Sequence, residues 1–275
     1  MPDSIFLTDG SSFTPTAHAR GPWDPNALHG GAPAALMAAA LERVEPGSQL
    51  PIARLGVELL RPIPLAPLKL STSIVRPGRR VQELAGELSA VLDGVELVVA
   101  RASALRVQAV AAEVADAATA LAAHDAGGSP QPGHLPPPQE GRLVRFALDD
   151  PDRDSFAASA MEMRWLSDPR ELGPAQVWMR LRHPLLAGEP LSALARLAAT
   201  ADFGNGVGAA LPFERFLFLY ADLTLHLQRQ PLGEWIGLDA RTWLHGGGTG
   251  LAESVLHDVH GPLGRAFQTL VVQPR

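Results

Sequence analysis

GGAPAALMAAALERV, residues 30–44, decides how the rest of the chain is interpreted, because alanine or leucine occupies eight of the ten positions from 32 to 41. Such a segment favours a helix, and a helix that is apolar on all sides is buried. Pro33 suits the first turn, and Pro46-Gly47 marks the end. The sequence therefore predicts a long buried helix that other elements must cover.

Four strand-like runs follow this helix, separated by short turns. They cover residues 54–60, 68–76, 80–92 and 95–107. The separators contain proline or glycine, and the last of them, Asp93-Gly94, suits a two-residue hairpin turn. The first part of the chain is thus predicted to form a buried helix followed by an antiparallel meander.

The composition changes after this meander. Residues 108–154 are first alanine-rich and then rich in proline and glycine, which indicates a linker with one short helix over 111–123. Beyond it the sequence predicts a helix over 191–202 and strands over 160–166, 176–182, 217–228, 235–244, 250–259 and 264–273. We therefore predict an N-terminal unit (1–108), a linker (109–153) and a C-terminal unit (154–275).

Two landmarks recur in both halves at a nearly constant offset. Arg61 and Arg229 each precede a proline-containing turn, and Gly94 and Gly261 each lie in a hairpin turn. The offsets are 229 − 61 = 168 and 261 − 94 = 167. A constant offset is what a duplicated unit produces. The prediction is an α+β protein of two tandem units, each a long central helix wrapped by an antiparallel sheet.

The composition excludes several functions. There are no cysteines among the 275 residues, which excludes disulfides, thiolate metal sites and a cysteine nucleophile. The formal net charge of -6 argues against a nucleic-acid partner. The nine histidines lack metal-ligand spacing, so no metal is expected. The sequence has neither a signal peptide nor a membrane-span pattern, which favours a cytoplasmic protein.

Three stretches resemble the acyl-CoA thioesterase II family. They are Leu28-His29-Gly30-Gly31 before the alanine-rich helix, VELLRPIP over residues 57–64, and GRAFQTL over residues 264–270. The resemblance covers nearly the whole chain apart from the linker. It implies a double hotdog fold and hydrolysis of fatty acyl-CoA by an activated water, with no metal, cofactor or covalent intermediate. It also implies an acyl-CoA partner and a homo-oligomer.

The same resemblance assigns catalytic residues. The family's Asp falls on Asp202, where it would act as general base, and the family's Gln falls on Gln268. The hydroxyl position aligns with either Tyr220 or Thr224, and we expect Thr224 to hold the water and Tyr220 to contact substrate. As strand residues, Tyr220, Asp222 and Thr224 are predicted to share one face, while Leu219, Ala221 and Leu223 share the other.

The residues before the first helix are the candidates for binding substrate. Gly30 and Gly31 allow a close approach, and backbone N–H groups at a helix N-terminus are donors for a thioester oxyanion. His29 is expected to contact substrate without a catalytic role. The arginines are expected to meet the CoA phosphates, and the acyl chain is expected to lie beside the buried helices.

Two other functions stay open at this point. The fold also supports enoyl-CoA hydratases or dehydratases, which need an Asp and a His close together, and the stretch after Asp202 contains no such histidine. A non-catalytic acyl-CoA-binding protein is the other alternative, because Tyr220 stands where a small hydroxyl residue is expected.

Overall fold

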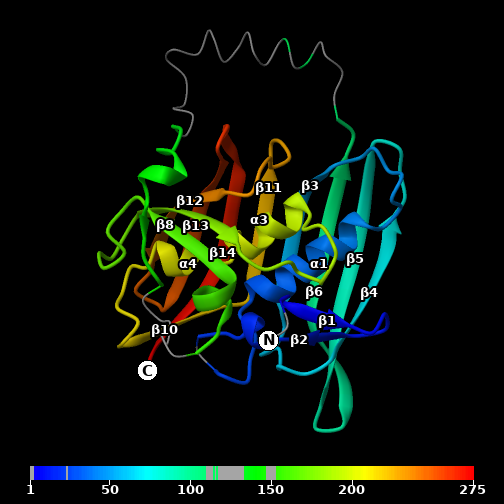
Figure 1. Cartoon of the computed structure of the whole chain (residues 1–275), viewed down its shortest axis with the longest axis horizontal. Helices are drawn as coiled ribbons and strands as arrows, with labels where there is room; N and C mark the ends of the chain where they lie inside the picture. The colour runs from blue at the N-terminus through cyan, green and yellow to red at the C-terminus, as the bar shows by residue number, and fades with distance from the viewer. Residues whose placement is uncertain (1–2, 23, 110–113, 115, 117–132, 147–152) are drawn as a thin grey trace.

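A computed structural model describes residues 3–22, 24–109, 114, 116, 133–146 and 153–275. Figure 1 shows two helices lying across one face of a large curved sheet. The first half contributes β1 (Phe6–Thr8), β2 (Phe13–Pro15), β3 (Ile52–Leu59), β4 (Leu68–Arg76), β5 (Val81–Leu92) and β6 (Val95–Val107). Before β3 lie the 3-10 turn η1 (Ala17–Ala19) and helix α1 (Gly31–Glu42).

The second half begins with η2 (Pro138–Glu140), β7 (Arg142–Leu143) and a π-helical turn, η3 (Phe156–Ala160). It continues with β8 (Met161–Trp165), β9 (Ala175–Leu181), and the helices α3 (Ala193–Ala201) and α4 (Gly204–Val207). The last strands are β10 (Phe216–Tyr220), β11 (Asp222–Leu227), β12 (Ile236–Leu244), β13 (Thr249–Asp258) and β14 (Gly261–Pro274).

The strands form one antiparallel sheet whose order repeats in mirror fashion about its centre. On one side of the centre the order is β2-β4-β5-β6-β3, and on the other it is β11-β14-β13-β12-β9. The two halves meet where β3 pairs with β11, with Gly56 opposite Thr224. Gly94 and Gly261 lie at the corresponding hairpins with positive φ. This layout fits two hotdog units, as the sequence predicted.

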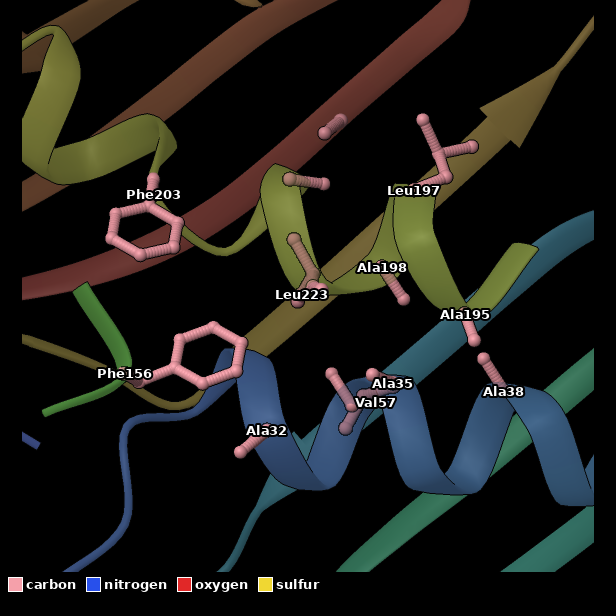
Figure 2. Close-up of a cluster of buried hydrophobic side chains, with 14 of the residues drawn as sticks. Ala32, Ala35, Ala38, Val57, Phe156, Ala195, Leu197, Ala198, Phe203 and Leu223 are labelled. Atoms are coloured by element: carbon pink, nitrogen blue, oxygen red, sulfur yellow. The ribbon is translucent and has the colours of Figure 1, made fainter. Parts of the chain in front are cut away.

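The two central helices pack against each other in opposite directions. Ala35 and Ala38 of α1 face Ala198 and Ala195 of α3 (Figure 2). These small side chains let the two backbones come close while the rest of each helix is covered by the sheet. Both helices are almost completely buried, which explains why α1 carries apolar residues on all sides.

The helix predictions are met only in part. α1 has 12 residues and matches the predicted first helix, whereas α3 has nine and is followed by the separate four-residue α4. A long central helix in both units is therefore not confirmed. In the described part of the chain, no helix is long and apolar enough to span a membrane.

Several expectations from the sequence are not tested by the structure. Most of the helix predicted over 111–123 lies outside the described residues. The unit boundaries at 108/109 and 153/154, the cytoplasmic location and the homo-oligomeric state stay predictions.

Candidate active site

The candidate site lies where the start of α1 meets the end of α3. Asp202 caps the C-terminus of α3, and its carboxylate is only 1% exposed. Its Oδ2 atom lies 2.9 Å from Nδ1 of His29, which stands two residues before α1. Asp202 lies at the negative, C-terminal end of α3, whereas His29 stands before the positive, N-terminal end of α1. The pair therefore joins one residue from each half of the chain.

Aromatic rings fix the position of the imidazole. The ring centroid of His29 is 5.0 Å from that of Phe156 and 4.4 Å from that of Phe203. Figure 2 shows these two phenyl rings facing each other near the start of α1. The His29 side chain is 11% exposed, so it is more accessible than the carboxylate it touches.

Gly31 is required by the close approach of the two halves. A Cβ at this position would lie 2.7 Å from the carbonyl oxygen of Ala199 and 2.8 Å from Cε1 of Phe156. Contacts this short do not occur in folded proteins, so a larger residue would push α1 away from α3. Glycine at this position thus lets His29 reach Asp202.

Most of the backbone N–H groups at the start of α1 already donate a hydrogen bond within the protein. The Gly31 N–H points at His29 Nδ1 at 3.1 Å, and the Ala32 N–H donates to the carbonyl oxygen of His29. Pro33 has no N–H. Among the hydrogen bonds of the described residues, none uses the N–H of Gly30. Of the predicted glycine donors, the Gly30 amide is therefore the one left for a ligand.

The side chain of Gln268 forms hydrogen bonds with the backbone between α3 and α4. Its Nε2 donates to the carbonyl oxygen of Asp202 at 3.1 Å, and its Oε1 accepts from the N–H of Asn205 at 2.9 Å. The side chain is almost fully buried on β14. Gln268 thus contacts the backbone of Asp202 and that of Asn205, three residues further along the chain.

Thr224 does not join the other two predicted catalytic residues. It pairs with Gly56 and Phe267 on neighbouring strands, and its Oγ1 lies 4.0 Å from the position that a Gly56 Cβ would take. Its neighbours Leu223 and Leu225 are buried against the helices. Because side chains alternate along a strand, Thr224 lies on the outer face of the sheet and Gln268 on the inner face.

The predicted alternation over residues 219–225 is wrong. Leu219 and Leu223 were expected on one face, but Leu219 is 44% exposed whereas Leu223 is 1% exposed. The reason is an interruption at Ala221, where β10 ends before β11 begins. The backbone of Tyr220 pairs with Leu270, and its side chain lies outside the described part of the structure.

Ser254 is a hydroxyl residue on the inner face that the sequence reasoning missed. It is buried on β13, and its Oγ would lie 2.6 Å from a Cβ placed on Gly204. Oε1 of Gln268 would lie 3.0 Å from the same Cβ, so the two side chains approach α4 together. The buried positions Ala252 and Leu256 alternate with Ser254, and this pattern could have placed it.

The opposite end of the helix pair has a different arrangement. Glu42, the last residue of α1, accepts hydrogen bonds from the hydroxyl of Ser192 and the N–H of Leu194 at the start of α3. Burial raises the pKa of this carboxyl group above its ordinary value. The buried guanidinium of Arg106 donates to the carbonyl oxygens of Leu41 and Glu42.

A cavity opens beside η3. Its volume is about 290 Å³. Its wall includes Ala157, which follows Phe156, the residue in contact with His29. The lining is mostly apolar with two arginines: Leu143, Val144, Arg145, Ala157, Ala158, Met161, Met163 and Arg182. Among the described residues, no group of three His, Cys, Asp or Glu side chains is arranged to hold a metal ion.

Solved structures share this fold at low sequence identity. A protein of unknown function with a hotdog fold from Alicyclobacillus acidocaldarius is 19% identical, with a TM-score of 0.69 and coverage of 99% of this chain and 97% of that one. An acyl-CoA thioesterase II from Mycobacterium marinum is 19% identical, with a TM-score of 0.63 and 90% coverage of both chains. The tesB protein of Mycobacterium avium subspecies paratuberculosis is 14% identical, with a TM-score of 0.62 and coverage of 98% and 96%.

Comparison with curated proteins gives no match. The family models, in contrast, match most of the chain. The acyl-CoA thioesterase N-terminal domain matches residues 19–107, and the acyl-CoA thioesterase C-terminal domain matches residues 130–272. With both domains present in the order that the family names imply, the chain belongs to the acyl-CoA thioesterase family.

Proposed function

We propose that this protein hydrolyses acyl-CoA thioesters to a free acid and CoA with a water activated at the Asp202–His29 pair. The observation that carries the proposal is the buried carboxylate of Asp202, 2.9 Å from an imidazole at the start of α1. Membership of the acyl-CoA thioesterase family supports the substrate and the reaction. A carboxylate and an imidazole in contact can accept a proton from water.

The thioester carbonyl needs a donor for its developing negative charge. We assign this role to the N–H of Gly30, because the following two amides already hydrogen-bond to His29. An amide at the positive end of α1 stabilises an oxyanion without having to reorient. Attack by the water would then expel CoA as the leaving group.

Gln268 supports this chemistry by fixing the carboxylate. Its two hydrogen bonds to the backbone of Asp202 and Asn205 hold the turn that presents Asp202 to His29. The second N–H of its amide is the donor that would orient a water. Thr224, on the outer face, is left out of this scheme.

The cavity beside η3 suits part of an acyl-CoA. Its apolar wall matches an acyl or pantetheine segment, and Arg182 supplies a positive charge for a phosphate or carboxylate. Ala157 in the cavity wall follows Phe156, whose ring contacts His29. We propose this cavity as the place where the substrate enters.

The decisive experiment measures CoA release from acyl-CoAs of increasing chain length with a thiol-reactive dye. The chain has no cysteine, so the protein adds no background signal. We expect Asp202→Asn to lower kcat by about two or more orders of magnitude, as loss of an acid–base group does. Asp93→Asn is the matched control, because Asp93 lies in an exposed turn with φ of 50°, which Asn tolerates.

Absence of CoA release by the wild type from any acyl-CoA would overturn the proposal. In that case two alternatives are distinguished by further assays. Enoyl-CoA hydration is the second candidate, and the observation that favours it is the Asp–His contact that the sequence alone did not predict. Binding of acyl-CoA without hydrolysis or hydration would indicate a non-catalytic acyl-CoA-binding protein.

A further inference from the structure

We propose that acidification releases residues 133–137, here called the strap, from the outer face of the sheet, because His257 beneath them has to reach water when it takes up a proton. This switch is independent of the proposed thioesterase activity. Three features of the described residues carry it: the buried row under the strap, the small number of hydrogen bonds that hold the strap, and the unpaired ring nitrogens of His257.

A row of three paired residues crosses the outer face of the sheet. Trp178 on β9 pairs with Gly237 on β12, which in turn pairs with His257 on β13. The next pair along, Val177 with Leu238, belongs to the hydrophobic core, so the row lies on the opposite face. Trp178 and His257 are nevertheless only 1% exposed. Another segment must therefore cover them from outside.

The strap is this cover. Nε1 of Trp178 donates a hydrogen bond to the carbonyl oxygen of Pro136 at 2.6 Å. Cδ1 of Leu135 would lie 2.7 Å from a Cβ atom on Gly237, so the leucine side chain packs directly on the glycine in the middle of the row. The absence of a side chain at Gly237 thus lets the strap lie close to the sheet beside His257.

Few hydrogen bonds hold the strap in place. Besides the bond from Trp178, Nε2 of His134 donates to the carbonyl oxygen of His260 at 3.2 Å. Among the described residues, no other hydrogen bond joins the strap to the rest of the fold. Residues 136 and 137 are prolines and have no N–H to donate. Opening the strap therefore requires much less free energy than unfolding a strand of the sheet.

The imidazole under the strap lacks hydrogen-bond partners. Neither Nδ1 nor Nε2 of His257 has a partner among the described residues, and both atoms are buried. The charged or titratable side chains around it are Asp239 on β12, His134 on the strap, Asp258 on β13 and Arg229 between β11 and β12. A positive charge on His134 would repel a second one on His257, which favours separation of the strap from the sheet.

Both carboxylates near His257 are already occupied. Asp239 accepts a hydrogen bond from Nε2 of Gln176 at 3.0 Å, and the two oxygens of Asp258 accept from the guanidinium of Arg229 at 2.6 and 2.7 Å. An imidazolium in the closed state therefore has no acceptor for its N–H groups, whereas water supplies acceptors in the open state.

The direction of the pH effect follows from burial. In the open state His257 contacts water and titrates near its ordinary pKa of about 6.5, whereas burial in the closed state lowers this pKa. Below pH 6.5 the open state binds the additional proton, so its population relative to the closed state rises by up to about tenfold per pH unit. Above pH 6.5 the imidazole is neutral in both states, and the strap stays closed.

The indole N–H of Trp178 can report the opening, because it exchanges with solvent deuterium only when its bond to the strap breaks. Nuclear magnetic resonance on nitrogen-15-labelled tryptophan follows the five indole N–H groups, and Trp178→Phe identifies the signal. Exposed Trp243 gives the intrinsic exchange rate at each pH. We expect the exchange rate of Trp178 relative to Trp243 to rise by up to about tenfold per pH unit below about pH 6.5.

Two variants remove the titrating group. His257→Leu and His257→Phe should make the ratio of exchange rates independent of pH, because neither side chain takes up a proton. Circular dichroism checks that they fold, and the two side chains differ in size so that one can fit the buried position. His134→Gln is the matched control, which should keep the pH dependence because His257 is still present.

Three results would overturn the inference. The first is a ratio in the wild type that does not change with pH. The second is a pH dependence that persists in a folded His257 variant and disappears in His134→Gln. The third is exchange of the buried Trp165 that accelerates together with Trp178, because this would show unfolding of the whole domain. None of these measurements uses CoA release, so the switch and the proposed function are tested separately.

Discussion

The side-chain oxygen of Gln268 accepts a hydrogen bond from the backbone N–H of Asn205, while its side-chain nitrogen donates to the carbonyl of Asp202. Gln268→Ala leaves both buried backbone groups without a partner. We expect it to lower the free energy of unfolding by about 1–3 kcal/mol. Activity should fall too, because the turn that carries Asp202 loses its support. Urea unfolding and CoA release measure the two effects, with Thr269→Ala, at the next and exposed position, as control.

Thr224→Val tests whether the hydroxyl of Thr224 takes part in catalysis. Because Thr224 lies on the outer face beside Gly56, loss of its hydroxyl should change kcat/KM by no more than about twofold. A loss of two orders of magnitude in a folded variant would contradict this and return Thr224 to the catalytic group. Steady-state CoA release on the best substrate is the measurement.

Gly31→Ala tests whether the contact between the two halves requires a residue without a Cβ atom at the start of α1. The new Cβ would meet Ala199 and Phe156 at less than 3 Å, so the start of α1 must shift. We expect a loss of about 1–3 kcal/mol in stability and of roughly 100-fold in kcat. Gly47→Ala, where no atom lies within 4 Å of the new Cβ, should leave both unchanged.

His257 provides a pH-dependent test outside the site. Burial lowers the pKa of this imidazole below its ordinary 6.5, with Asp239, His134, Asp258 and Arg229 as its charged or titratable neighbours. Below pH 6.5 the unfolded chain takes up a proton that the folded protein does not. Stability present above pH 6.5 is therefore lost as the pH falls toward the folded-state pKa.

The variant His257→Phe should remove this dependence. The expected change is a reduction of the slope of unfolding free energy against pH by up to about 1.4 kcal/mol per pH unit below pH 6.5. Urea midpoints at several pH values give the slope. His226→Phe, at an exposed strand position, should leave it unaltered, and an equal slope in wild type and His257→Phe would contradict the prediction.

The strands of both meanders could be predicted because each has a strong local signal. The predicted runs 68–76 and 95–107 coincide with β4 and β6, since proline, glycine and Asp93-Gly94 mark their ends. The hairpin of β1 and β2 was not predicted. Its strands have three residues each, which is too short for periodicity to indicate them.

The site was less predictable than the fold. Asp202 and Gln268 were placed together through resemblance, but the contact between Asp202 and His29 joins segments that are far apart in the sequence. A contact between distant segments produces no periodic pattern of hydrophobic residues in the sequence. The shared face predicted for Leu219 and Leu223 is wrong because one interruption at Ala221 is enough to exchange the two faces of a strand.

The two ends of the helix pair show what joining the units in one chain permits. In a homodimer of single units, a twofold axis would force both ends to carry the same residues. Here one end holds His29 and Asp202, while the other holds Glu42 bonded to Ser192 and Leu194. Once the copies were covalently joined, their sequences were free to diverge. One end of the helix pair could then carry the candidate catalytic residues, while the other end links the two helices by hydrogen bonds.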